Sequence, residues 1–352
     1  MDPTYTGAFG RVRVYGNDFL PEDFIRRLMA TKTIDEMVSE LFGTFYRQDM
    51  ELFTAVYKGI DLISISLNHR LILRNKIALF AAPVPGRDVI RAYLSKWDIS
   101  NIKSVLSSKY LGYGIKETES FLVSFRDVPI GIFGGNLTRD DYNAMMSQSS
   151  VDSVVNYLSN FGYGQQILLN MDRFRKSGDI SLLLSALDTY YYSQLVESVK
   201  FYNGDEGPLR AFISEEIDLR NLMIVLKSLD LGIEFERIRE GLIPAGTMDM
   251  GRLQEIFSAG SVTQAIDKLG SYGNMKQAAQ AYEQTRRLES LESSIRSDIL
   301  KRYIDIFNSQ ALSVGSVFAF ILRSELERER IRSVSLGKYY SVSEDRIKSL
   351  IF

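Results

Sequence analysis

An acidic pair, Asp140–Asp141, is the feature of the sequence most similar to a catalytic motif. Two adjacent aspartates begin the acidic motif of all-helical enzymes that act on prenyl chains. That motif requires a further aspartate three residues after Asp141, and this chain has Ala144 at that position. The pair therefore does not complete the motif.

Two glycine patterns resemble parts of nucleotide-binding loops. Gly337–Lys338 is similar to the end of a phosphate loop, but Tyr339 replaces the hydroxyl residue that would hold Mg²⁺. Arg332 stands where the first glycine of that loop belongs. Gly112-Tyr-Gly114 and Gly162-Tyr-Gly164 lack the third glycine of a dinucleotide-binding motif, and we expect helix C-caps and turns there.

Nucleophilic and metal chemistry have few residues to draw on. The chain has no cysteine, which excludes disulfides, thiolate catalysis and cysteine-based zinc sites. His69 is the only histidine, so neither a Ser-His-Asp triad nor a histidine metal site is supported. His69 falls within a predicted long helix, where a structural or surface role is favoured over catalysis. No catalytic residue, cofactor or metal site is predicted.

The composition is that of an ordinary globular protein, with 45% hydrophobic and 24% charged residues among 352. A net charge of −2 argues against nucleic-acid binding, which normally requires a basic face. Residues 1–16 lack the apolar segment of a secretion signal. The longest apolar run, Val314 to Leu322, is shorter than the ~20 residues that span a bilayer. We expect a soluble, cytoplasmic protein that reaches a membrane only through a partner.

One short stretch occurs three times, and its copies begin at Thr33, Ser150 and Ser261. The second copy starts 117 residues after the first (150 − 33), and the third starts 228 residues after it (261 − 33). Serine or threonine at such a start suits a helix N-cap, because the hydroxyl accepts from an unpaired backbone N–H. Glu36 and Gln264, three residues on, predict a capping box in two copies. Apolar residues follow at helical spacing in each copy, namely Ile34, Val38, Leu41, Val151, Val155, Leu158, Val262, Ile266 and Leu269.

The second long helix of each repeat also recurs. Asp98 and Asn101 match Asp218 and Asn221 at an offset of 120 residues. Glu327 takes the acidic position in the third copy, at an offset of 229, where Arg330 replaces the asparagine. We interpret each acidic residue as fixing a neighbouring helix or backbone segment within its own domain. A contact with a partner protein is the alternative.

The sequence therefore predicts an all-α protein that contains one helical unit three times. The period of roughly 115 residues is far longer than the 34 to 47 residues of common helical repeats, so each unit is a domain. We expect domains at 1–125, 126–245 and 246–352, and a short strand at 121–125. Three similar domains can close into a pseudo-threefold ring or lie in a row.

Three features together resemble one family. They are the triplicated helical unit, the helix from Lys96 to Lys109 that contains Asp98, and the segment Glu216-Ile-Asp218-Leu-Arg-Asn221-Leu. The closing segment from Leu322 to Lys338, which contains Glu327, adds to them. The chain resembles, over essentially its whole length, the C subunit of archaeal and bacterial A/V-type ATPases, the counterpart of the d subunit of eukaryotic vacuolar ATPases.

The resemblance implies three helical domains arranged as a funnel. It implies a place on the cytoplasmic face of the membrane, between the rotor ring of proteolipid subunits and the central stalk. Such a protein transmits torque during ATP synthesis or ion pumping and catalyses no reaction. Nucleic acid and direct insertion into the membrane are not expected.

Two other functions remain open from the residues alone. A helical adaptor for unrelated protein partners would have the same fold. An all-helical enzyme acting on a small hydrophobic substrate would require an apolar pocket with converging carboxylates and a metal ion.

Overall fold

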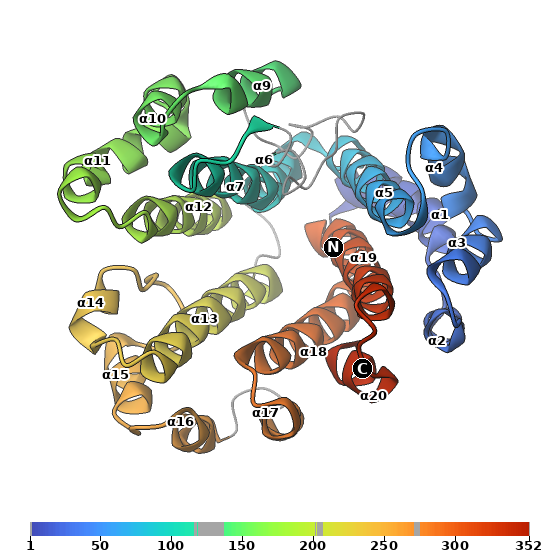
Figure 1. Cartoon of the computed structure of the whole chain (residues 1–352). Helices are drawn as coiled ribbons and strands as arrows, with labels where there is room; N and C mark the ends of the chain where they lie inside the picture. Colours follow the sequence, from blue (N-terminus) through green and yellow to red (C-terminus); the bar gives the residue numbers. More distant parts are fainter. Residues whose placement is uncertain are drawn as a thin grey trace. The chain divides into compact units, whose positions relative to one another are not determined.

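The computed structural model describes residues 2–115, 118, 137–200, 202, 207–270 and 275–351, and every regular element among them is a helix (Figure 1). The predicted all-α class is thereby confirmed. The strand expected at 121–125 lies outside the described residues. No described helix is long and apolar enough to cross a membrane.

The chain divides into two compact units. The first contains Met1–Leu71 and Gly204–Phe352, and the second contains Ile72–Asn203. This division follows spatial contacts rather than the sequence repeat, so the boundaries expected near residues 125 and 245 stay a prediction.

Three modules of short helices recur at the spacing of the sequence repeat. The first helices begin at residues 22, 139 and 250, and the second helices begin at 34, 151 and 262, so both sets keep the offsets of 117 and 228. The helices are α2 (Glu22–Ala30), α3 (Ile34–Phe42) and α4 (Tyr46–Phe53), then α9 (Arg139–Ser147), α10 (Val151–Leu158) and α11 (Gly162–Ser177), then α15 (Met250–Phe257), α16 (Val262–Leu269) and α17 (Met275–Thr285).

The repeated N-caps explain why the second helix of each module starts where it does. Thr33, Ser150 and Ser261 each have extended backbone, and each hydroxyl accepts from the N–H three residues on. The Glu36 carboxylate bonds to the N–H of Lys32 rather than to that of the cap, so the predicted reciprocal bond is displaced by one residue. A complete capping box forms instead at Thr138 and Asp141, at the start of α9.

Longer helices follow each module along the chain. They are α5 (Gly59–Ala81), α6 (Val84–Leu94), α7 (Lys96–Tyr110), α12 (Ser181–Lys200), α13 (Gly207–Asp230), α18 (Leu288–Asn308) and α19 (Val314–Tyr339). Shorter elements are η1 (Pro3–Tyr5), α1 (Thr6–Tyr15), η2 (Gly16–Asp18), α14 (Phe235–Arg239) and α20 (Glu344–Ile351). The helical spacing of apolar residues in the sequence predicts one helix at each of 49–80, 87–111 and 282–311. The structure divides each of these segments in two, with breaks after 53, 94 and 285.

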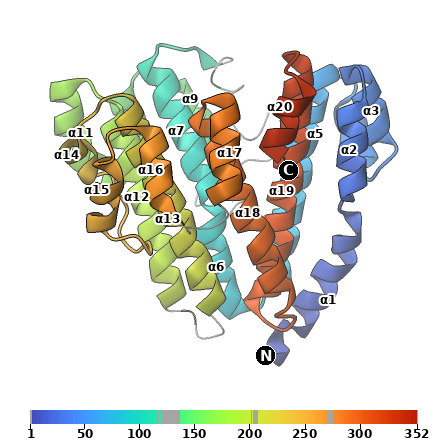
Figure 2. The same ribbon diagram turned by 90° about the horizontal axis from the view of Figure 1, so that it is seen from below.

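The core of the first unit contains the pair α18 and α19, which lie side by side in Figure 2. Phe307 and Phe318 face each other across this pair with ring centroids 6.0 Å apart. Phe212 of α13 adds an edge-to-face contact with Tyr303 at 5.2 Å. Aromatic packing of this kind contributes about 0.5–1.5 kcal/mol per pair beyond area burial, so it fixes these three helices together.

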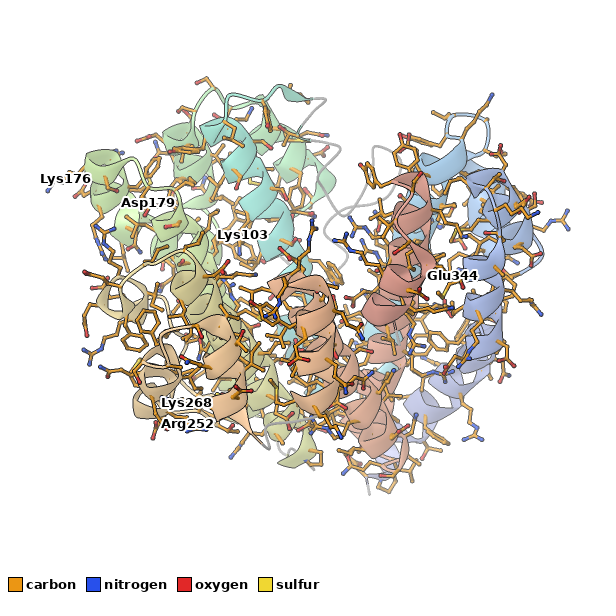
Figure 3. The ribbon with its side chains drawn as sticks, turned by 60° about the horizontal axis from the view of Figure 1, so that its bottom comes forward. Lys103, Lys176, Asp179, Arg252, Lys268 and Glu344 are labelled. Carbon is orange, nitrogen blue, oxygen red and sulfur yellow. The ribbon has the colours of Figure 1, made fainter. Side chains whose placement is uncertain are left out.

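Polar contacts also tie helices within each unit. In the third module the Arg252 guanidinium donates to the backbone carbonyl of Lys268, which joins α15 to α16; the two side chains lie together in Figure 3. In the second unit Lys103 of α7 donates to both carboxylate oxygens of Asp188 on α12 at 2.9 Å. Both contacts are partly exposed to solvent. We assign each of them only the role of holding its own pair of helices together.

Candidate functional site: carboxylate joints and apolar tips

Three buried carboxylates lie on the long helices α7, α13 and α19. The side chains of Asp98 and Asp218 are 0% exposed, and Glu327 is 6% exposed. A buried carboxylate is costly unless hydrogen-bond donors surround it, so its partners must be held firmly in place. We call the three sets of contacts the carboxylate joints.

Asp98 of α7 is held by two tyrosines of the second module. The hydroxyl of Tyr142 on α9 donates to Oδ1 at 2.7 Å, and the hydroxyl of Tyr163 on α11 donates to Oδ2 at 3.3 Å. Both tyrosines are themselves buried. This joint therefore fixes two helices of the module against α7.

Asp218 of α13 is held by backbone at the start of the third module. It accepts from the N–H of Thr247 at 3.1 Å and from the N–H of Met248 at 2.9 Å, and the Thr247 hydroxyl donates as well. Gly246 permits this approach, because a Cβ there would lie 2.2 Å from Asp218 Oδ1. The carboxylate thus binds a segment of chain rather than another side chain alone.

Glu327 of α19 combines both kinds of partner in the first module. Its Oε2 accepts from the backbone N–H of Leu20 at 2.6 Å, and its Oε1 accepts from the hydroxyl of Tyr46 at 2.8 Å. Leu20 and Met248 each lie 13 residues before the N-cap of their module (33 − 20 and 261 − 248). Tyr46 and Tyr163 each lie 13 residues after it (46 − 33 and 163 − 150).

The partners show a regular order along the chain. Asp98 holds the second module, Asp218 holds the third, and Glu327 of the last long helix holds the first. Each acidic residue thus contacts a neighbouring helix or backbone segment, and each contact lies within one of the two compact units. The assignment of each contact to a single repeat domain stays a prediction, together with the boundaries near residues 125 and 245. Each of these long helices holds a module other than the one that precedes it in the sequence.

A lysine adds a second bond in two of the joints. Lys338 of α19 donates to the carbonyl of Met29 at 2.7 Å and to that of Thr31, at the C-terminal end of α2. Lys109 of α7 donates to the carbonyl of Met146, at the same place on α9. A cation suits the last turn of a helix, whose carbonyls carry partial negative charge. In each of these two joints, a lysine of the long helix therefore holds the C-terminal end of the first short helix of the module, which is α2 or α9.

The polar residues three positions after each acidic residue are in different surroundings. Asn221 forms two bonds to Ile243, because its amide nitrogen donates to the carbonyl at 2.7 Å and its oxygen accepts from the N–H at 2.8 Å. Asn101 is fully buried near Tyr142. Burial lowers the pKa of Arg330, which replaces the asparagine in the third copy.

Burial raises the pKa of Asp98 from 3.8 to about 6, and the hydrogen bonds from Tyr142 and Tyr163 act in the opposite direction. The folded chain therefore binds this proton more tightly than the unfolded chain does. The resulting contribution to stability is full below about pH 4 and is lost as the pH rises through 6. Burial and the nearby Asp98 also raise the pKa of Tyr142. The Tyr142 hydroxyl therefore stays protonated, and remains a hydrogen-bond donor, over the pH range in which Asp98 titrates.

Asp98→Asn is expected to flatten this pH dependence. A shift of about two pKa units corresponds to about 3 kcal/mol, so the wild-type free energy of unfolding should fall by that amount, relative to Asp98→Asn, between pH 4 and pH 7. Urea unfolding of both proteins at four pH values measures the difference. Asp172→Asn, at a side chain that is 87% exposed, serves as control. Parallel pH curves for wild type and Asp98→Asn would contradict the assignment.

The structure accounts for the residues that resembled catalytic motifs. The Asp141 carboxylate completes the capping box of α9 by accepting from the N–H of Thr138 at 2.7 Å, and it also accepts from the Tyr157 hydroxyl at 2.6 Å. His69 contacts the buried carboxylate of Asp49 at 2.6 Å, which agrees with a structural role. Gly337 allows α20 to pack on α19, because a Cβ there would lie 2.5 Å from Ile347. No group of three metal-ligating side chains occurs among the described residues.

The glycine pairs have two different roles. Gly112 ends α7 in a left-handed conformation, with φ of 75°, as expected for a C-cap. Gly162 and Gly164 instead begin α11, which the sequence interpretation missed. A Cβ on Gly164 would lie 2.1 Å from the carbonyl oxygen of Leu158, so close packing of α10 on α11 requires this glycine.

The three joint helices end in the same backbone motif. The residue after the last turn has positive φ in each, and the next N–H bonds to the carbonyl five residues back, as in a Schellman motif. The positive-φ residues are Gly112, Gly232 and Ser341. The bonds are Tyr113 to Ser108, Ile233 to Ser228 and Val342 to Gly337, at 2.8, 2.8 and 2.7 Å.

Each of these helix ends displays a large apolar side chain. Leu111 is 59% exposed, Leu231 is 71% exposed and Tyr340 is 70% exposed. They occupy one repeat position, at the offsets of 120 and 229 that relate the acidic residues (231 − 111 and 340 − 111). We call these three residues the apolar tips. Sequence reasoning missed them, although their spacing from the acidic residues was available.

The comparison with known proteins covers nearly the whole chain. The family model described as "ATP synthase (C/AC39) subunit" matches residues 8–350. Proteins named as the C subunit of A-type ATP synthase are similar over nearly their whole length. The one from Thermoplasma volcanium is 39% identical over all of this chain and 99% of its own, and the one from Thermoplasma acidophilum is 38% identical with the same coverage. The one from Methanocaldococcus jannaschii is 22% identical over 99% of this chain and 86% of its own. The chain therefore belongs to the ATP synthase (C/AC39) subunit family.

Proposed function

We propose that this chain is a non-catalytic coupling subunit of an A-type ATP synthase. It joins the membrane rotor ring to the central stalk and transmits torque between them. Its place is on the cytoplasmic side of the membrane, where it is held by protein partners. Membership of the ATP synthase (C/AC39) subunit family, and full-length similarity to proteins named as C subunits of such synthases, support the assignment to such a complex.

The single observation that carries the contact role is the set of three apolar tips. A solvated leucine or tyrosine gains about 25 cal/mol per Å² when a partner covers it, so an exposed apolar side chain at each repeat favours association. A large, exposed apolar side chain thus occurs three times, at Leu111, Leu231 and Tyr340. A partner built of repeated subunits, such as a rotor ring, suits a contact that is itself repeated.

The carboxylate joints support the mechanical part of the proposal. Torque passes through a protein only if its helices keep their positions under load. Each joint holds a long helix to a module of short helices through bonds of 2.6–3.3 Å. Close-packed interiors also deform little, so buried joints of this kind transmit strain.

Replacing the three tips together should weaken assembly without unfolding the chain. Leu111→Ser, Leu231→Ser and Tyr340→Ser in one protein should lower its affinity for the rotor ring or the stalk at least about tenfold, because each loses an apolar contact. Its melting temperature should change by less than about 2 °C, since exposed sites contribute little to folding. Pull-down with purified ring and stalk proteins measures the affinity.

The matched control replaces three other exposed apolar residues, Leu52, Val56 and Leu169, by serine. That variant should assemble as wild type does. Equal loss in both variants, or none in the tip variant, would remove the tips from the contact surface. Failure of the folded wild-type chain to bind either partner would contradict the proposed function and would favour a general helical adaptor.

A further inference from the structure

A polar pocket of about 340 Å³ lies in the first unit, where α1 meets the adjoining ends of α18 and α19. Figure 2 shows α1 beside these two helix ends. None of the joints or tips includes any of its lining residues. The pocket is therefore separate from the carboxylate joints and the apolar tips.

Hydrogen-bond donors dominate the polar lining. Arg13 of α1 and Arg323 of α19 supply two guanidinium groups, and Asn17, Asn308 and Ser316 supply amides and a hydroxyl. None of the described residues that line the pocket is acidic. The nearest acids along the chain, Asp18, Asp305 and Glu325, are not among the lining residues. Glu327 is engaged by Leu20 and Tyr46. The lining therefore favours a negatively charged group.

Both guanidinium groups lie over aromatic rings. Arg323 lies 4.3 Å from the ring centroid of Phe19, and Phe19 in turn contacts Phe320 edge-to-face at 5.4 Å. Arg13 lies 5.7 Å from the ring centroid of Phe9. A guanidinium carries five N–H donors, so contact with a ring does not prevent it from also binding a carboxylate. Each of the two cations thus has an aromatic neighbour beside the pocket.

The start of α19 adds to the positive potential. Ser316 lies in the first turn of this 26-residue helix, where backbone N–H groups give the helix end a partial positive charge. Gly16 brings backbone close to the second cation, because a Cβ there would lie 3.9 Å from Arg323 Nη1. The pocket thus combines two side-chain cations with the positive end of a helix.

Apolar walls narrow the choice of anion. Val12 and Phe320 are buried residues of the lining, and Phe9 completes an apolar side. A volume of 340 Å³ would hold about ten waters at ~30 Å³ each, which is more than one small inorganic ion fills. A carboxylate attached to an apolar stem fits both parts of the lining, whereas a bare phosphate would leave the apolar wall uncovered.

We propose that this pocket binds the carboxylate of a glutamate or aspartate side chain on a neighbouring protein of the ATPase complex. The identity of that neighbour rests on the proposed function, but recognition of the carboxylate does not. Arg323 and Arg13 bind the carboxylate oxygens, and the side formed by Phe9, Val12 and Phe320 covers the stem and an adjacent apolar residue.

The test uses the isolated full-length chain and two peptide probes, acetyl-Leu-Glu-Leu-amide and acetyl-Leu-Gln-Leu-amide. Backbone amide NMR shifts of residues 13–17 and 316–323 report binding. The glutamate peptide should give saturable shifts there, and the glutamine peptide should bind at least about tenfold more weakly, because it lacks the charge that both arginines recognise. Arg13→Gln with Arg323→Gln should weaken binding of the glutamate peptide by a similar factor.

Arg11→Gln is the matched control, since Arg11 is an exposed arginine of α1 outside the pocket. It should leave binding unchanged. Arg323→Lys keeps the charge and should bind with intermediate affinity, which separates charge recognition from loss of fold. Equal binding of the two peptides, or absence of local shifts, would overturn the proposal. Inorganic phosphate that bound as tightly as the glutamate peptide would also overturn it, by indicating a small-ion site. Each of these results is independent of assembly with the ring or stalk.

Discussion

Asp98→Ala is expected to lower the free energy of unfolding by about 3 kcal/mol at pH 5. The change removes the carboxylate that accepts from the buried hydroxyls of Tyr142 and Tyr163, and the loss of a buried hydrogen-bond partner costs about 1–3 kcal/mol. At pH 5 a carboxyl with a pKa of about 6 is mostly protonated, so little charge burial is relieved by its removal. Urea unfolding of wild type and variant gives the difference.

Two companion variants identify the cause of that loss. Tyr142→Phe and Tyr163→Phe, added to Asp98→Ala, remove the two hydroxyls that donated to the carboxylate and should restore at least about half of the lost stability. Asp172→Ala, at an exposed aspartate of the same unit, should change stability by less than about 0.5 kcal/mol. No recovery with the phenylalanines would mean that Asp98 fills space rather than joins helices.

Gly164→Ala should lower the stability of the protein more than the addition of one methyl group usually does. The added methyl group would lie 2.1 Å from the oxygen of Leu158 and 2.2 Å from the nitrogen of Ser159, and both are backbone atoms. Relief requires α10 and α11 to separate, which exposes the core face of the second module. We expect a loss of about 3–5 kcal/mol, at the upper end for a single added methyl group.

Gly10→Ala provides the contrast, because no atom lies within 4 Å of the position that its Cβ would take. Alanine in the interior of α1 should stabilise the chain by about 0.5–1 kcal/mol. Thermal unfolding of both variants is sufficient to compare them. A Gly164→Ala protein that melts like wild type would show that the approach of the two helices is not required.

Local signals in the sequence were sufficient for the repeated modules. Thr33, Ser150 and Ser261 could be identified as caps because an N-cap bond is made within three residues of the chain. Helical spacing of apolar residues then predicted each following helix. The breaks after residues 53, 94 and 285 were missed, because the helical pattern continues on both sides of each break.

The partners of the carboxylates could not be read from local pattern. Glu327 and Leu20 are separated by 307 residues, and only the fold brings them together. One signal was present but unused, since Tyr46 and Tyr163 occupy the same position in their modules. Tyrosine repeated in that way indicates a shared hydroxyl contact, although it does not identify the acceptor. The left-handed residue Ser341 was likewise hidden, because serine rarely takes that conformation while Gly112 and Gly232 take it readily.

Coupling between ATP hydrolysis and ion movement is the measurement that tests the central claim most directly. The complex would be assembled in lipid vesicles with and without this chain, and ATP hydrolysis would be followed together with a voltage-sensitive dye. Without the chain, we predict continued hydrolysis by the catalytic head and no membrane potential, with the potential restored when the wild-type chain is added. A membrane potential of normal size in its absence would contradict the proposal that this protein transmits torque from stalk to ring.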